Sequence, residues 1–344
     1  MAFAVPVRHY KPFLFEGCPL VWLKRIAVSL VVVLVAVFAV LRYQGVQRLA
    51  AYTGGGLARP LPDAARWAGQ SCTVAPMQVL SYNVMYGSAF IEAMAARFKH
   101  GETGKGELPW SVRLPEIRAR IAEYNADLIG LQEMGTAADV AMIVPPEQYS
   151  LVSYRQGSVE YADSALLYRT ARFEQLDAGQ LWLGNDPELP MSLGFRRLSM
   201  IRYVNWVLLR DKASGFTFLY ANTHFDNAGV NKDPSSLLFR ARVAGLAKQM
   251  PVIVTGDFNT TAQEARYQHI IGANVQPPLL ANAYSLAHNP PVPPQLHPDK
   301  RIDHIFVGGP CHVEADNWLL DTRPLQNGLP MSDHDLLTAQ VRFF

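Results

Sequence analysis

Pro251-Val-Ile-Val-Thr-Gly-Asp-Phe-Asn259 joins a short apolar run to an acid and an amide. The run Val252–Val254 predicts a buried strand that stops at the glycine, because it is continuous and rich in β-branched residues. Side chains alternate along an extended chain, so Asp257 and Asn259 are expected to share one face. Such a pair suits a site for a water, a metal ion or a phosphate oxygen, although acids and amides also cluster in ordinary turns.

Polar side chains follow five other hydrophobic runs along the chain. An alternating run that begins at Met77 ends on Asn83, and the run 127–133 ends on Glu133. The full set at these run ends is Asn83, Glu133, His224, Asp226, Asp257, Asn259, Asp303, Asp333 and His334. Each residue alone could be a turn residue, a solvated end or a satisfied core side chain. The repetition of the pattern in six places indicates one shared site.

Helical and hairpin patterns separate these runs. Apolar spacing predicts a helix over 113–124 and a second from Asp233-Pro234 to Met250, with the aspartate as its cap. The segments 203–209 and 216–222 flank a turn and predict a β-hairpin.

Two later segments complete the pattern. Thr261 and Glu264 predict a capping box that opens another helix. Residues 272–300 contain seven prolines and no periodicity, so we expect a long surface loop, in which substrate selectivity could reside. Strands outnumber helices, and helices lie between some of them. We therefore predict an α+β fold, a two-sheet β-sandwich flanked by helices.

The charge distribution separates the amino-terminal segment from the rest. The chain has 344 residues, 31 basic and 29 acidic, and residues 1–53 hold six of the basic residues and one acid. The remaining 25 basic and 28 acidic residues make the main domain mildly acidic. A dedicated nucleic-acid binder would carry a basic surface, so we expect no stable nucleic-acid partner.

Residues 26–41 form an apolar run with basic residues on both sides. This run is somewhat short for a spanning helix but lengthens if Lys24 and Arg25 extend toward the interface, which predicts a transmembrane anchor over 26–43. The basic residues before it predict a cytoplasmic amino terminus and an exported remainder. The alternatives are a cleaved signal peptide, which would also export the domain, and a buried soluble helix.

Three cysteines are too few for a disulfide scaffold. Cys18 precedes the apolar run, whereas Cys72 and Cys311 follow it. In an exported domain these last two could pair, or they could be two separate buried thiols.

The chemistry of the polar set favours a hard cation. Four or five carboxylates without a thiolate indicate Mg²⁺, or Mn²⁺, rather than zinc. A magnesium site uses one or two carboxylates, which leaves the other acids and the histidines for proton transfer and orientation. Taken alone, the set indicates metal-assisted hydrolysis of a phosphoester.

The ordered motifs resemble those of the endonuclease/exonuclease/phosphatase superfamily, the DNase I-like fold. The resemblance covers residue 77 to the carboxyl terminus. Its motifs are Ser81-Tyr-Asn83-Val, Leu131-Gln-Glu133, Asn222-Thr-His224-Phe-Asp226, Gly256-Asp257-Phe-Asn259, Ile302-Asp303-His-Ile-Phe and Ser332-Asp333-His334. Segments 164–169 and 202–206 are also similar to the family.

The resemblance implies a role for each residue. Glu133 would be the main Mg²⁺ ligand, with Asn83 beside it and Asp333 as a further ligand, and Asp257 would activate or orient the attacking water. The residues implied to contact the phosphoryl group are His224, Asn259, His334, Arg202 and Asp226. Asp303 would hold the His334 imidazole and raise its pKa.

The chain departs from the family pattern in two places. Met85 stands where some relatives carry an acid, which leaves a second metal ion in doubt, and Asp335-Leu336 replaces an apolar-proline pair that often follows the last histidine.

We therefore expect a basic cytoplasmic leader (1–25), a membrane anchor (26–43), a linker (44–75) and a catalytic domain (76–344) that is monomeric and lies outside the cytoplasm. The expected substrate is a phosphoester, more specifically a phosphodiester, from nucleic acids, phospholipids of the sphingomyelin type or small phosphoesters. The alternative is a non-catalytic binding or scaffold module on the same fold.

Overall fold

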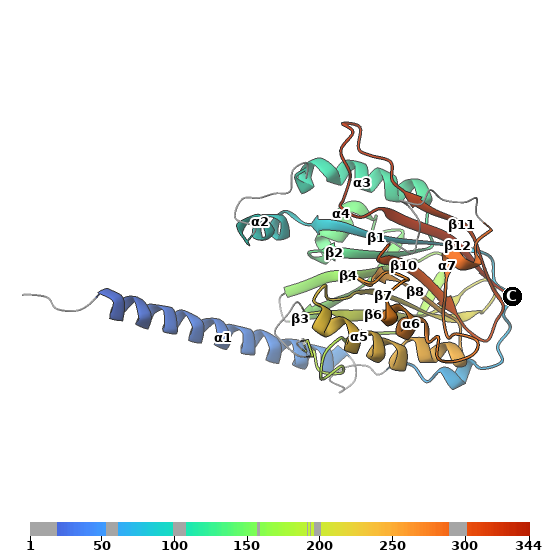
Figure 1. The fold of residues 1–344 in the computed structure, drawn as a ribbon, viewed down its shortest axis with the longest axis horizontal. Helices are drawn as coiled ribbons and strands as arrows, with labels where there is room; N and C mark the ends of the chain where they lie inside the picture. The colour runs from blue at the N-terminus through green and yellow to red at the C-terminus, as the bar shows by residue number, and fades with distance from the viewer. Residues whose placement is uncertain are drawn as a thin grey trace, which may run out of the picture.

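The computed structural model describes residues 19–52, 61–98, 108–156, 159–190, 192, 194–195, 201–288 and 301–344. These residues form two six-stranded sheets that pack face to face, with helices on both outer sides (Figure 1). The predicted two-sheet sandwich is confirmed.

The first sheet has the strand order β11-β12-β1-β2-β4-β3 and the second β5-β6-β7-β8-β10-β9. The strands of the first sheet are β1 (Met77–Gly87), β2 (Leu128–Met134), β3 (Tyr149–Gln156), β4 (Val159–Arg169), β11 (Val313–Asp321) and β12 (Leu336–Phe343). Those of the second are β5 (Phe173–Trp182), β6 (Tyr203–Asp211), β7 (Thr217–His224), β8 (Val252–Asp257), β9 (Ala281–Asn282) and β10 (Asp303–Gly308). The β6–β7 hairpin was predicted, whereas β3, β9 and β11 were not.

Parallel pairing places the polar residues that end the apolar runs at one edge of the sandwich. β1 pairs in parallel with β2, and β7 pairs in parallel with β8, so the carboxyl ends of each pair meet. The β7–β8 register brings His224 opposite Asp257, and the β8–β10 register brings Asp257 opposite Asp303. β1 also packs across the interface against β8 and β10. Residues far apart in sequence are thereby gathered at one place.

Three apolar layers hold this arrangement. Side chains from both inner sheet faces, including Val79, Phe218 and Ile253, form the central layer. On the outer face of the second sheet, α5 (Gly229–Arg242) and α6 (Ala265–Ile271) pack through Phe239 and Ile270. The outer face of the first sheet carries α3 (Trp110–Tyr124) and α4 (Ala137–Ile143), whereas α2 (Ala89–Phe98) lies beyond the carboxyl end of β1 (Figure 1). α3 ends at Asn125, whose left-handed backbone terminates it as expected.

Near the site the inner faces become polar, and the sheets approach closely. Gln132 of β2 donates to Asn222 Oδ1 at 2.7 Å, and Thr255 of β8 donates to the same oxygen at 3.0 Å. A side chain at Gly130 would collide with both Asn222 and Thr255, so the glycine permits this approach. β8 also continues through Gly256 to Asp257, whereas the sequence predicted that the strand stops at the glycine.

Two predicted helix starts are wrong. α5 begins at Gly229, so Pro234 lies inside it. The first turn is bound by Asp226 rather than by Asp233, because Asp226 accepts hydrogen bonds from the Ala228 backbone N–H and from the Asn231 side chain. Asp233 instead pairs with Arg266 at 3.0 Å.

Thr261 and Glu264 do interact, since the Thr261 backbone N–H donates to Glu264 Oε1 at 3.0 Å. They close a turn that precedes α6, whose cap is Glu264 without a side-chain cap bond. The expected loop 272–300 contains β9 and the short helix α7 (Ala283–Leu286), so it is not wholly irregular. Residues 289–300 lie outside the described part.

The amino-terminal part of the chain consists of a long helix and, after it, an approach segment (residues 61–75) that leads into β1. α1 runs from Pro19 to Tyr52, past the point where the linker was expected to begin. Within the described ranges, no helix combines the length and the apolar character needed to cross a membrane. Residues 61–75, assigned to the linker, pack on the sandwich: Ala64 and Val74 are buried. The short 3₁₀ helix η1 (Ala64–Trp67) lies here.

Cys72 and Cys311 form a disulfide, which decides between the two sequence alternatives. The bond joins the approach segment to the turn between β10 and β11 and spans 239 residues of sequence.

Candidate active site

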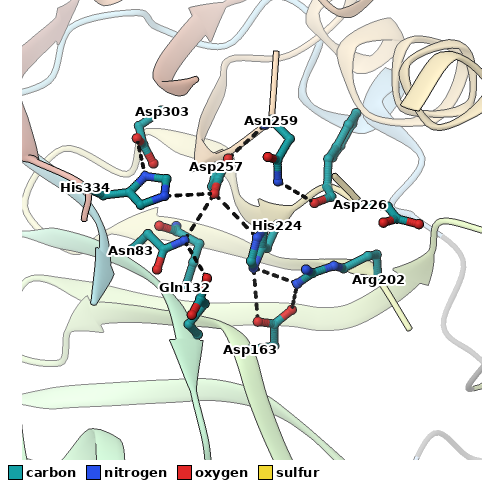
Figure 2. A network of polar contacts seen from close by, with 12 residues as sticks. Asn83, Gln132, Asp163, Arg202, His224, Asp226, Asp257, Asn259, Asp303 and His334 are labelled. Atoms are coloured by element: carbon teal, nitrogen blue, oxygen red, sulfur yellow. Dashed lines mark hydrogen bonds and ion pairs between the residues drawn. The ribbon is translucent and has the colours of Figure 1, made fainter. Parts of the chain in front are cut away.

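The carboxylate of Asp257 lies at the centre of the site, with only 1% of its surface exposed. Its Oδ2 atom lies 3.1 Å from Asn83 Nδ2, 3.4 Å from His224 Nε2 and 3.7 Å from His334 Nε2 (Figure 2). The other oxygen accepts the Asn259 backbone N–H at 2.8 Å. Three side chains from separate segments therefore converge on one carboxylate oxygen.

His334 lies on the irregular segment between β11 and β12, and Asp303 orients its ring. Nδ1 of His334 contacts Asp303 Oδ2 at 2.7 Å, which turns Nε2 toward Asp257 (Figure 2). Burial lowers the pKa of His334, but the charges of Asp303, Asp257 and Asp333 outweigh it and raise the pKa to about 10. The imidazole is therefore a cation at neutral pH, as the resemblance implied.

His224 ends β7 and is held by a different set of partners. Its Nδ1 lies 3.1 Å from Asp163 Oδ1 and 2.6 Å from Arg202 Nη1, and Arg202 donates to Asp163 Oδ2 at 2.6 Å. Burial raises the pKa of Asp163, but Arg202 and His224 outweigh it and hold that pKa well below its usual range. Asp163 was missed by the sequence analysis, although an acid shortly before the apolar residues 165–167 of β4 was a signal.

Glu133 and Asn83 form the third part of the site. Asn83 Nδ2 donates to Glu133 Oε1 at 3.2 Å, and the Tyr86 backbone N–H donates to Oε2 at 3.1 Å. Asn83 Oδ1 accepts the Met85 N–H at 3.0 Å, so its NH₂ group faces the two acids. Met85, Tyr86 and Glu133 all have positive φ angles of 52–63°. Such backbone is costly for residues other than glycine and is concentrated at functional sites.

The donor chemistry fits a hard divalent cation. Carboxylate oxygens predominate, and in the described residues the site has more acidic than basic side chains. Donor atoms of Asp257, Asp303 and His334 also lie within 4.8 Å of one another. Asp303 is already engaged in orienting His334, and the Asn83 side chain donates to the carboxylates of both Glu133 and Asp257, which links these two acids.

Several predicted site residues have partners within the protein. Asp226 is buried, and its carboxylate accepts hydrogen bonds at the start of α5, so its contact with substrate phosphate stays a prediction. Arg202 is directed to Asp163. One N–H of the Asn259 side chain donates to the Phe225 carbonyl at 2.9 Å. Asp333 is exposed and lies 3.3 Å from the Ser332 hydroxyl.

Residues 80–334 match the model of the Endonuclease/Exonuclease/phosphatase family. The match covers most of the chain, so the protein belongs to this family and is a hydrolase of phosphoester bonds.

Solved structures share the fold. The mannosyl-6-phosphatase Bt3783 of Bacteroides thetaiotaomicron has 24% identity and a TM-score of 0.60, with 78% of this chain and 100% of that chain covered. A family member from Bacteroides vulgatus has 22% identity and a TM-score of 0.61, covering 79% and 100%. The human Nocturnin catalytic domain has 18% identity and a TM-score of 0.58, covering 83% and 100%. None of the curated proteins matches the chain.

Proposed function

We propose that this protein is a Mg²⁺-dependent phosphodiesterase, attached to a membrane and acting outside the cytoplasm. The observation that carries the catalytic part is the buried Asp257 carboxylate, which two histidines and an amide approach from separate segments. A water or a phosphoryl oxygen held beside this carboxylate would touch both a proton acceptor and proton donors.

Asp257 accepts a proton from the attacking water or fixes the orientation of that water. His334, a cation at neutral pH, donates a hydrogen bond to the phosphoryl oxygens, whose negative charge grows in the transition state. His224 supplies the same kind of contact from the β7 side, with Asp163 and Arg202 as its support. Asn259 is positioned beside Asp257 by its backbone hydrogen bond.

Glu133 would hold the Mg²⁺ ion, with Asn83 orienting its carboxylate and Asp333 as a further candidate ligand at the exposed side. When bound, the ion neutralises charge on the phosphoryl group. The acids and histidines of the site thus differ in role: Glu133 would bind the ion, whereas Asp257 and His334 act on water and phosphate.

The substrate is proposed to be a phosphodiester that is short or lipid-borne rather than a long nucleic acid. The mildly acidic domain supports this choice, because binding to nucleic-acid phosphates normally requires many basic residues. A sugar-phosphate monoester is the second candidate, since one structure of the same fold is described as a mannosyl-6-phosphatase.

Membrane attachment through residues 26–43 and a monomeric domain outside the cytoplasm remain proposals. Large apolar side chains between Ile26 and Val40 of α1 are exposed, which supports contact with lipid. The Cys72–Cys311 disulfide supports an oxidising compartment. Extraction of the full chain from membranes tests the attachment: a chain recovered in the soluble fraction without detergent contradicts it.

The test of the catalytic proposal compares the full chain with Glu133→Gln and with Glu147→Gln, a matched change at an exposed turn. Each protein is assayed with Mg²⁺, and again with chelator, on bis-p-nitrophenyl phosphate, sphingomyelin, oligonucleotides and mannose 6-phosphate. We expect diester hydrolysis that requires metal, is lost in Glu133→Gln and is retained in Glu147→Gln. Equal background in all three proteins would support the scaffold alternative, and turnover confined to the monoester would support the second candidate.

A further inference from the structure

A second ion pair lies beside the Asp303–His334 contact. Nη1 of Arg301 lies 2.6 Å from Asp335 Oδ2, and both side chains are about one quarter exposed (26% and 24%). Asp335 occupies the position where the sequence departs from the family pattern. The acid at this position therefore has a definite partner in the structure.

Both contacts join the same two segments. Arg301 lies two residues before Asp303, and Asp335 directly follows His334. Two contacts between the same segments fix a relative orientation, whereas one hydrogen bond leaves the loop-borne ring free to rotate about it. The partial burial of the Arg301–Asp335 pair also makes it stronger than a fully exposed pair, because water screens it less.

The segment that carries His334 has no regular structure, so side-chain contacts determine its position. On the β1 side, Ser332 donates to the Asn83 carbonyl at 2.8 Å, and Arg113 donates to the Met331 carbonyl at 2.9 Å. On the β10 side, the described contacts are the two pairs to Asp303 and Arg301. The segment is thus held between both sheets.

We propose that Arg301 and Asp335 are positioning residues for His334, and that their ion pair keeps the imidazole in line with Asp257. This inference rests on the proposed function of His334. Loss of the pair would misplace the ring relative to the phosphoryl group without removing a substrate contact. It should therefore lower kcat and leave KM unchanged.

A double-mutant cycle in the full chain tests this inference. Arg301→Ala, Asp335→Ala and the double variant are expected to lose kcat equally, each by about tenfold, since a small misplacement of a catalytic group has effects of this order. The reversed pair, Arg301→Asp with Asp335→Arg, should recover part of the loss. Arg342→Ala is the matched control, because the exposed Arg342–Glu314 pair at 3.0 Å also joins two chain segments, β11 and β12.

The proposal would be overturned by additive losses or by an unchanged kcat. A rise in KM confined to Arg301→Ala would also overturn it, because such a rise assigns Arg301 to direct substrate binding. Thermal unfolding of every variant identifies a loss that comes from unfolding alone. An activity-independent measurement is the downfield NMR signal of the hydrogen-bonded His334 Nδ1 proton. It should weaken in Asp335→Ala and persist in Arg342→Ala, and an unchanged signal in both contradicts positioning.

The two proposals fail in different ways. A wild-type protein with no more turnover than Glu133→Gln contradicts the proposed function, and the NMR comparison then still decides whether the pair orients His334. Turnover that requires metal, together with fully active Arg301 and Asp335 variants, contradicts only the positioning role.

Discussion

The two histidines that face Asp257 are supported in opposite ways. His224 ends a regular strand, is 3% exposed, and has an aspartate–arginine pair behind it. His334 lies on an irregular segment, its side chain is 14% exposed, and Asp303 and the neighbouring Arg301–Asp335 pair hold it. Backbone pairing within the sheet determines the position of His224, independently of its side-chain contacts. The position of His334 depends on side-chain contacts alone.

This difference predicts where mutations act. Disruption behind His224 should affect folding first, because the supporting charges are buried in the sandwich. Disruption around His334 should affect catalysis first, because the segment lies at the edge and contributes less to the core.

The largest expected effect comes from the oxygen that both histidines approach. Asp257→Asn keeps the shape of the side chain but removes the proton acceptor and the negative charge, so kcat/KM should fall by about 10³-fold. Steady-state turnover of the preferred phosphoester measures this. Asp316→Asn, a change at a partly exposed position on β11, should retain wild-type turnover. A drop of less than tenfold in Asp257→Asn would assign the water-activating role to another residue.

The next effect concerns the support of His224. Arg202→Met leaves Asp163 buried without its guanidinium partner, which should lower the free energy of unfolding by about 3 kcal/mol. Denaturant titration gives the value. The double variant Asp163→Leu, Arg202→Met should be more stable than Arg202→Met alone, because no charge remains unpaired. If both variants are as stable as the wild type, the pair does not support β7.

A smaller effect should follow from the support of His334, and it depends on pH. Burial lowers the pKa of His334, but the charges of Asp303, Asp257 and Asp333, with Asp303 contributing most, raise it above its ordinary 6.5 to about 10, so the charged ring persists through neutral pH and is lost as pH rises through 10. The contribution of the charged His334 to the free energy of unfolding is complete below pH 6.5 and is lost as the pH rises from 6.5 through about 10. In Asp303→Asn, the alkaline limb of kcat should move to lower pH. The Asp316→Asn control, which alters an exposed histidine–acid contact, should not shift it.

The sequence located most of the site because strand ends are visible as apolar runs followed by polar residues. Asp257, His224 and Glu133 were found in this way, and strand pairing brought them together as expected. Asp163 was missed because its importance depends on Arg202, a residue just before β6 of the other sheet that lies 39 residues away in sequence. Periodicity carries no information about such a partner.

Other differences have the same origin. Asp226 belongs to the same sequence motif as His224. Its carboxylate nevertheless faces the start of α5, because the chain turns directly after β7. The packing of residues 61–75 depends on contacts such as the one from Gln70 to Thr217, which a glycine- and proline-rich composition does not reveal. Local patterns predict elements, whereas roles at the site require long-range contacts.

The smallest expected effect concerns Asp333, next to His334. Asp333 is exposed and contacts Ser332, whereas Glu133 accepts two hydrogen bonds that aim its carboxylate into the site. Asp333→Asn should therefore raise the Mg²⁺ concentration for half-maximal activity by only about twofold, since a screened surface charge contributes little. Glu133→Gln should abolish saturable metal binding in a calorimetric titration. Equal losses of metal affinity in the two variants would make Asp333 a direct ligand and place the ion nearer to the His334 segment than to β2.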